Sequence, residues 1–215
     1  MSNIKPLPSF EDLVSDKALA HKQDQLTVLL NQAPPDKWVK EHPYIRGFKY
    51  LPIDKVEYLL KKLFRAYKIE VTESKMLLNA VTVTVRIHYQ DPITGEWSYH
   101  DGVGAKELQT QKDSGNLKMD MSNINRGAME MALPIAKTVA IKDACDHFGR
   151  LFGSDLNRKE TIDYTVNEKF KPVLTFDSPN FEKIKEAVHS GAMPIEKLKL
   201  SYSVTNEVME VLTNV

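Results

Sequence analysis

The sequence contains a single cysteine, Cys145, among 215 residues. One thiol cannot form an internal disulfide or a four-cysteine zinc site, so a disulfide-rich or zinc-finger fold is excluded. The six histidines show no zinc-ligand spacing, and we expect no metal site. Low cysteine usage fits a reducing compartment, and the start of the chain lacks the apolar core of a signal peptide. We therefore expect a cytoplasmic protein.

Long hydrophobic runs are absent as well. Charged residues interrupt every apolar stretch before it reaches the roughly 20 residues that a membrane-spanning helix needs, so no membrane association is expected. Hydrophobic residues still make up 42% of the chain and charged residues 27%. This composition excludes disorder over most of the length and favours a chain with a buried core.

No phosphate-binding loop of the form Gly-x-x-x-x-Gly-Lys-Ser/Thr occurs anywhere in the sequence. ATP hydrolysis of the recombinase or helicase kind therefore has no site. The fragment Gly102-Val103-Gly104 follows a predicted strand without opening a helix, which indicates close backbone packing rather than nucleotide binding. We expect neither a cofactor nor catalytic residues.

The chain also has no net charge at pH 7, because its 29 basic residues balance 29 acidic ones. The chain lacks the bulk positive field that is typical of nucleic-acid-binding proteins. Within residues 36–75, however, ten basic residues stand against six acidic ones. A nucleic-acid site would have to gather its positive charge locally.

Hydrophobic periodicity predicts the elements of the core. Residues 81–89 alternate apolar and polar side chains and are expected to form a strand. A turn leads to a return strand over 96–103, which places Trp97 and Tyr99 on one face. A helix is expected over 54–66, with Asp54 as its N-cap.

The strongest helical pattern runs from Pro134 to Phe152, with Pro134 in the first turn. Alanines recur in it every fourth residue, so the helix can lie very close to a sheet. The preceding polar segment, 105–125, is predicted to be a long loop. The fold class expected from these patterns is α+β, with a curved antiparallel β-sheet packed on a long α-helix and a small C-terminal helical appendage.

Breaks in periodicity divide the chain into four parts. Residues 1–35 are expected to form an N-terminal arm with one short helix. Residues 36–158 form the core and residues 159–178 a linker. Residues 179–215 form a small helical C-terminal region, with helices over 179–189 and 204–213 and a further turn near Ile195.

Basic and aromatic residues interleave just before the helix at 54–66, namely Tyr44, Arg46, Phe48, Lys49 and Tyr50. Single-strand-binding proteins combine such phosphate donors with flat rings for base stacking. An ordinary solvated turn with core aromatics is an equally valid interpretation. On the long helix, Asp143 and Asp146 offset the charge of Lys137 and Lys142.

A metal-dependent nuclease is a less favoured interpretation, based on Asp54 followed by Glu73 and Lys75. Many unrelated sequences match this spacing by chance, and Asp54 is already expected to cap a helix. Cys145 is expected to be an inert buried residue, since Asp143 and Asp146 would raise its pKa.

Three separated blocks occur in the order found in one family of recombination proteins. They are residues 44–49, residues 83–87 leading to 97–104, and residues 136–153. In these blocks the chain resembles the Rad-fifty-two type of single-strand annealing protein, which includes phage recombinases such as Sak and is distantly similar to Erf and Red-beta. The resemblance covers roughly residues 38–158.

The resemblance implies a non-enzymatic DNA-annealing protein. Members of this family assemble into rings or helical filaments that hold single-stranded DNA and anneal it without ATP during homologous recombination and DNA repair. By analogy, the chain would be phage-encoded and act in the cytoplasm of a bacterial host cell. Residues 179–215 would contact an exonuclease or a single-strand-binding protein. An oligomeric structural protein without a DNA groove is the alternative.

Residue by residue, the resemblance assigns DNA contacts to Lys49 and Lys142. Family members carry arginines where this chain has Asp143 and Asp146, and their helix is uninterrupted at the position of Pro134. The predicted loop at 105–125 offers replacement charge. The full set of expected DNA-binding residues is Lys49, Lys142, Arg46, Lys137, Arg126, Tyr44 and Phe48.

Overall fold

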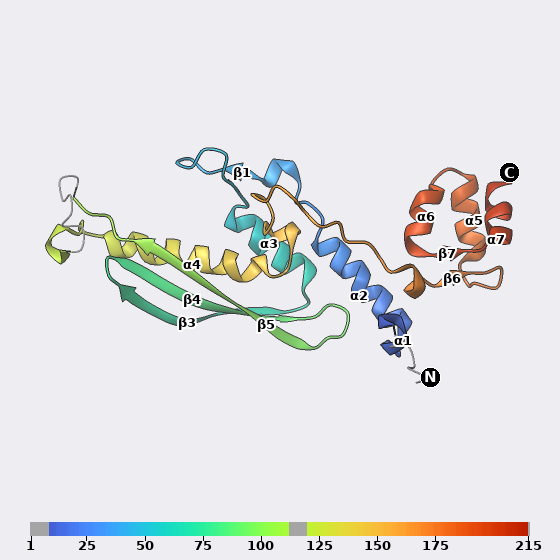
Figure 1. Ribbon diagram of the computed structural model, residues 1–215, viewed down its shortest axis with the longest axis horizontal. Helices are drawn as coiled ribbons and strands as arrows, with labels where there is room; N and C mark the ends of the chain where they lie inside the picture. The colour runs from blue at the N-terminus through green and yellow to red at the C-terminus, as the bar shows by residue number, and fades with distance from the viewer. Residues whose placement is uncertain (1–8, 112–119, 215) are drawn as a thin grey trace, which may run out of the picture. The chain divides into compact units, whose positions relative to one another are not determined.

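A computed structural model describes residues 9–111 and 120–214 of the chain (Figure 1). The chain divides into two compact units. One, called here the sheet unit, is Leu29–Asp163. The other, the terminal unit, combines Met1–Val28 with Tyr164–Val215. The fold class is α+β, as the sequence predicts.

An antiparallel sheet in the order β3-β4-β5 organises the sheet unit. Its strands are β3 (Tyr67–Leu77), β4 (Ala80–Gln90) and β5 (Trp97–Glu107). The central strand β4 alternates between half-buried and buried residues from Ala80 to Ile87, and its span confirms the strand predicted over 81–89. Trp97 and Tyr99 lie on one face, as expected from their spacing.

Strand β3 was not predicted from the sequence. Seven consecutive residues at its end are exposed, and the register against β4 shifts between Val71 and Glu73. An exposed edge strand needs no apolar alternation, because neither of its faces is covered there. Its pairing with β4 is therefore invisible to a periodicity argument.

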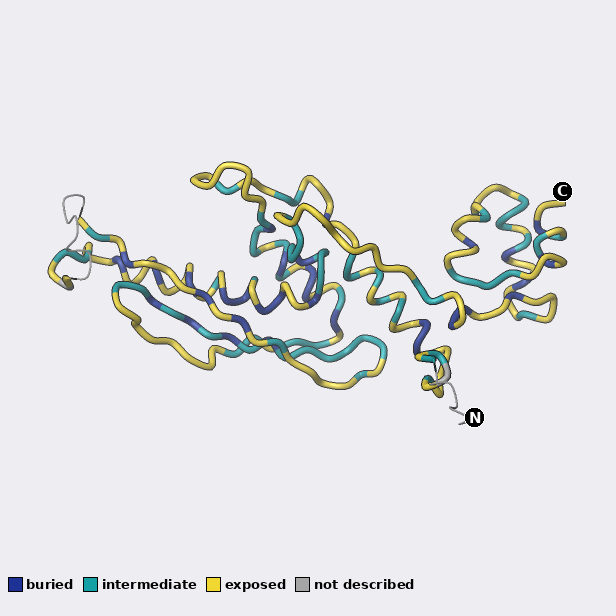
Figure 2. Tube along the Cα trace, in the orientation of Figure 1, coloured by how far each residue is buried: buried dark blue, intermediate teal, exposed yellow. Residues whose placement is uncertain are grey.

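Helix α4 (Ala128–Asp146) packs across β4 and β5. Its buried face is lined with small residues, and it meets β5 at Gly102 and Gly104. Figure 2 shows buried and exposed segments alternating along this helix. The predicted alanine row is confirmed: Ala132, Ala136, Ala140 and Ala144 are all buried.

The predicted bounds of this helix, Pro134 to Phe152, were wrong. The helix begins at Ala128, so Pro134 is inside it and not in its first turn. Proline costs one backbone hydrogen bond there, but the residue is exposed and the carbonyl one turn earlier can reach water. At the other end, Gly149 at φ 121 turns the chain into the short helix η4 (Arg150–Phe152).

Helix α3 (Ile53–Leu63) buries Val56, Leu59 and Leu60 in the same core as β4 and α4. The predicted N-cap at Asp54 was wrong, because Pro52 occupies the cap and makes no side-chain bond. Proline pre-sets the backbone angle that starts a helix. Asp54 lies in the first turn, where it pairs with Lys55 at 2.8 Å.

The remaining elements of the sheet unit are short. They are η1 (Asp36–Trp38), β1 (Lys40–Glu41), β2 (Lys49–Tyr50) and η3 (Met121–Asn123). Part of the predicted loop at 105–125 is strand, since β5 continues to Glu107, and a bridge joins Thr110 to Ile124. Residues 112–119 of that loop lie outside the described residues.

The terminal unit has its own small core. It is filled by buried apolar residues from its helices and from one short strand, namely Leu174, Phe181, Ile184, Leu198, Val208 and Leu212. Its elements are α1 (Phe10–Leu13), the start of α2 (Lys17–Leu30), η5 (Glu168–Phe170), β6 (Val173–Leu174), α5 (Phe181–His189), α6 (Ile195–Ser201), β7 (Ser203–Val204) and α7 (Asn206–Thr213). None of the described helices is long and apolar enough to cross a membrane.

Candidate nucleic-acid interface

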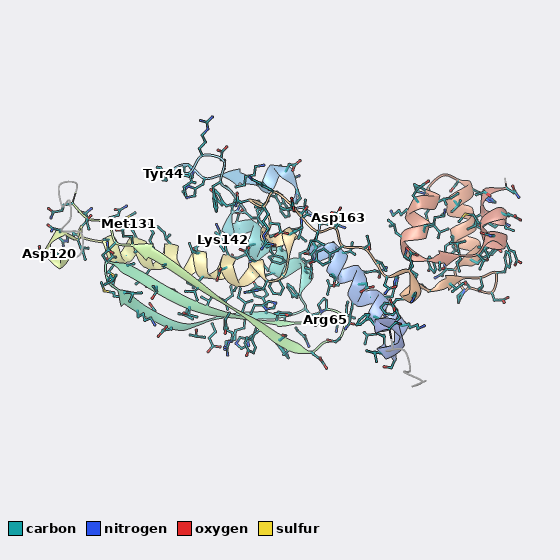
Figure 3. All side chains as sticks on the ribbon, viewed as in Figure 1. Tyr44, Arg65, Asp120, Met131, Lys142 and Asp163 are labelled. Atoms are coloured by element: carbon teal, nitrogen blue, oxygen red, sulfur yellow. The ribbon has the colours of Figure 1, made fainter. Side chains whose placement is uncertain are left out.

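A hairpin projects from the sheet unit between β1 and β2, over residues 40–50. The backbone N–H of Gly47, which has a φ of 76°, donates to the Glu41 carboxylate at 2.6 Å. The N–H of His42 donates to the carbonyl of Phe48 at 2.7 Å. These bonds fix the turn and leave Tyr44 at its tip 91% exposed (Figure 3).

Aromatic rings gather on this hairpin around His42. The centroid of its imidazole lies 6.0 Å from the ring of Tyr44, 6.1 Å from Phe48 and 6.2 Å from Tyr50. Tyr44 and Phe48 are exposed, so their faces are open to a ligand. Exposed rings held in fixed positions are what base stacking requires.

A groove with a volume of about 680 Å³ runs between the hairpin and the outer side of α4. We call it the hairpin groove. Phe48, Lys49 and Tyr50 line it from the hairpin, and Lys142 lines it from α4. The remaining lining residues are His42, Pro43, Leu51, Val139, Asp143, Asp146, Phe152, Gly153, Ser154 and Asn157.

The two lysines of the groove are held by different contacts. The Lys49 backbone is clamped by Asn157, whose Oδ1 accepts from the Lys49 N–H at 2.7 Å and whose Nδ2 donates to the Lys49 carbonyl at 2.8 Å. The Lys142 Nζ lies 4.8 Å from the centre of the Tyr50 ring, a cation–π contact. The backbone of Lys49 and the ammonium group of Lys142 are thus each held by a neighbouring residue.

Two carboxylates on α4 oppose this positive charge. Asp143 accepts a hydrogen bond from the Val103 N–H at 2.9 Å, so it is committed to the sheet. Asp146 is exposed as a residue, but its carboxylate is crowded by the groove wall. This desolvation, together with Asp143, raises its pKa to about 6, although His147 and Lys142 act in the opposite direction. Burial lowers the pKa of Lys142, partly offset by Asp146.

The sequence-predicted residues fall into three groups. Phe48, Lys49 and Lys142 line the hairpin groove, although 93 positions of sequence separate the two lysines. Arg46 and Tyr44 lie in the exposed turn of the hairpin. The last group, Lys137 and Arg126, is exposed outside the groove lining, Arg126 lying before the start of α4.

Sequence reasoning missed Asn157 and His42. Asn157 lies in a polar stretch with no periodicity, and its bond to Lys49 spans 108 positions, so no local signal exists. His42 lies two residues before the aromatic cluster that was singled out. Its neighbourhood of Tyr44, Phe48 and Tyr50 was the available clue.

The acidic residues of the nuclease interpretation each form an ion pair with a nearby lysine. Asp54 pairs with Lys55 at 2.8 Å, and Glu73 pairs with Lys75 at 2.9 Å on β3. Across residues 9–111 and 120–214, no group of three or more histidine, cysteine or acidic side chains is placed to hold a metal ion. Cys145 is fully buried, and this burial raises the pKa of its thiol.

A scan against models of known protein families and a search of curated proteins found no match to this chain. The functional argument therefore depends on the groove itself.

Proposed function

We propose that the protein binds single-stranded DNA in the hairpin groove and anneals complementary strands without ATP. One observation carries the proposal. Lys49 and Lys142, assigned to DNA contact from two separate blocks of sequence, line the same groove beside Phe48 and Tyr50. Homologous recombination and DNA repair, in a phage-infected bacterial cytoplasm, are the setting that the resemblance supplies.

The groove offers the two kinds of contact that sequence-independent binding needs. Lysine ammonium groups attract phosphates, and exposed aromatic rings stack on bases of any identity. The negative charges of Asp143 and Asp146 offset part of the positive electrostatic potential that the lysines create in the groove. We infer that the contact made by one subunit is weak, which favours reversible pairing over permanent capture.

A single groove would cover only a few nucleotides, whereas annealing displays many bases in register. Assembly of many copies, as a ring or a helical filament, supplies the missing length. Both β3 and β5 are edge strands of 11 residues. Apolar side chains are also exposed on α4, where Met131 is 56% and Val139 is 42% exposed. The long open edge of β3 and the exposed apolar row support self-association, whereas on β5 the N–H of Val103 is already bonded to Asp143.

The small helical C-terminal region, residues 179–215, is proposed to recruit an exonuclease or a single-strand-binding protein. Its helices α5 and α7 are strongly amphipathic and share one core with α6. A region with a core of its own can present its outer surface without altering the groove.

The function is tested by annealing kinetics. Two complementary oligonucleotides carrying a dye and a quencher are mixed in a stopped-flow instrument, without ATP and at several protein and salt concentrations. Pairing is expected to exceed the spontaneous rate at least about tenfold, and light scattering should show a mass of many subunits. Unchanged pairing rates, or a clean monomer throughout, would contradict the proposal. Magnesium-dependent shortening of the strands, abolished by Asp54→Ala, would favour the nuclease instead.

A pH dependence is expected from Asp146. Its pKa of about 6 means that the carboxylate gains its charge between pH 5 and 7, and this charge repels phosphates. Affinity for single-stranded DNA should therefore fall as pH rises through 6, and Asp146→Asn should flatten the profile and bind several-fold tighter at pH 7.5. Fluorescence anisotropy with a labelled poly-dT strand measures both. A wild-type profile that Asp146→Asn leaves unchanged would count against this role.

The same ionisation affects folding stability. The ordinary pKa of the Asp146 carboxyl is 3.8, so the folded protein holds this proton more tightly than the unfolded chain does. The contribution of Asp146 to stability is therefore complete below about pH 4 and is lost as pH rises to about 6. Above pH 6, Asp146→Asn is expected to raise the midpoint of thermal unfolding.

A further inference from the structure

The terminal unit contains a pocket of its own, with a volume of about 650 Å³. We call it the lysine pocket. One wall comes from α2 and the other from the chain around η5 and β6, closed by the end of α6. Its size falls within the usual range of about 300–1,000 Å³ for ligand sites. The lysine pocket shares no lining residue with the hairpin groove, and the inference drawn from it does not depend on the proposed function.

The charge of this pocket is one-sided. Its lining includes four lysines and no aspartate or glutamate among the described residues: Lys17, Lys22, Lys169 and Lys171. Lys169 reaches Glu11 at 3.4 Å, and Lys171 reaches Glu168 at 2.6 Å. Lys17 and Lys22 form no ion pair with any described residue. Two positive charges are therefore left for a ligand.

A buried polar group in the pocket lining also lacks a partner. His21 is 7% exposed, and its Nδ1 atom has no hydrogen-bond partner among the described residues. An unpartnered buried polar atom costs roughly 1–3 kcal/mol, so such atoms are rare unless a ligand or water completes them. His21 lies one helical turn after Lys17, on the same side of α2.

The walls of the pocket favour a peptide over a nucleic-acid strand. Phe170 is buried against Phe10, and Tyr202 is half-buried, so no exposed ring is offered for base stacking. Pro172 and Val173 add an exposed apolar surface. An apolar surface opposite the two unpaired lysines of α2 matches a ligand that has carboxylates on one side and an apolar side chain on the other.

The spacing of the free lysines fits an extended chain. Lys22 follows Lys17 by five positions, a rise of about 7.5 Å and a rotation of about 140° around the helix axis, so the two residues line the pocket through long flexible stems and not from one face of α2. Alternate residues of an extended peptide point the same way and are about 6.6–6.8 Å apart. In a Glu-x-Glu segment the two carboxylates lie at a comparable separation and the middle side chain points to the other side, which suits two flexible lysines on α2 and an apolar surface at Pro172 and Val173.

We propose that the lysine pocket is a docking site for an acidic peptide segment of a partner protein, with two carboxylates flanking an apolar side chain. Nothing in this assignment requires DNA in the hairpin groove.

The test uses the full chain and a synthetic fluorescent peptide containing Gly-Glu-Leu-Glu-Gly, followed by anisotropy. The peptide is expected to bind, and its Gln-Leu-Gln counterpart to bind at least about tenfold more weakly. Lys17→Ala with Lys22→Ala should weaken binding of the acidic peptide by about tenfold or more. Lys183→Ala with Lys197→Ala removes the same charge from exposed positions of the terminal unit and should leave binding unchanged. Circular dichroism checks that both double variants are folded.

Several results would overturn the assignment. They are no binding of the acidic peptide, equal binding of the glutamine peptide, and equal losses in the two double variants. A further contrary result is that Lys17→Ala with Lys22→Ala weakens binding of poly-dT but not of the peptide, which would make the pocket a DNA contact. Lys49→Ala in the hairpin groove serves as the cross-check. It should leave peptide binding intact, so failure of the groove and failure of the pocket are distinguishable.

Discussion

A single methyl group added at Gly104 is expected to destabilise the sheet unit by at least about 3 kcal/mol. A Cβ built there would lie closer than 3.0 Å to the carbonyl oxygen of Ala136 and the backbone nitrogen of Ala140. Both atoms belong to α4 and are held in the helical hydrogen-bond ladder. Gly104→Ala therefore has to push the helix off the sheet and open the core between them.

The atoms that a methyl group at Gly104 would meet belong to the backbone of α4 and not to a side chain. Because the obstacle is backbone, trimming a side chain does not help, and Ala140→Gly in the Gly104→Ala background should give no recovery. The neighbouring Val103 is 57% exposed, so Val103→Ala should cost less than about 1 kcal/mol. Urea unfolding followed by circular dichroism measures all three variants. A Gly104→Ala protein as stable as Val103→Ala would show that α4 does not approach β5 this closely.

The same helix–sheet contact explains what the sequence could reveal about the fold. Small residues recurring every fourth position in α4, and glycines alternating in β5, are local patterns with one common cause, a very close approach of two backbones. The strict alternation of β4 likewise reflects a strand covered on one face. These features were readable because burial imposes a period on the sequence.

Features that leave no apolar period, or that follow from the folded core, were not readable. The exposed residues of β3 form a strand because β4 offers its edge, and this leaves no apolar period. Asp54 matched a capping pattern, yet the N-cap is Pro52, two positions earlier, and the helix begins at Ile53. The clamp of Asn157 on Lys49 joins two loops that only the folded core brings together. For the candidate site, the sequence therefore indicated the charges and rings but not the groove.

The second large effect is expected when both groove lysines lose their charge. Lys49→Ala removes an exposed ammonium group, and Lys142→Gln removes the other while keeping most of the stem that packs on Tyr50. Each lost phosphate contact should weaken binding of single-stranded DNA about tenfold at low salt and reduce the slope of log affinity against log salt by roughly 0.7. The double variant should thus lose about a hundredfold in affinity, for every base composition alike.

A matched double variant separates a local contact from a change in overall charge. Lys61→Ala with Lys62→Ala removes the same two charges from exposed positions on α3, outside the hairpin groove, and should change affinity less than about threefold. Anisotropy at four salt concentrations gives both slopes, while light scattering and circular dichroism confirm assembly and folding. If the groove variant binds like wild type with an unchanged slope, the strand does not follow this groove. Arg126→Ala with Lys106→Ala then tests a path along the other end of α4, where a loss would place the phosphates beside β5.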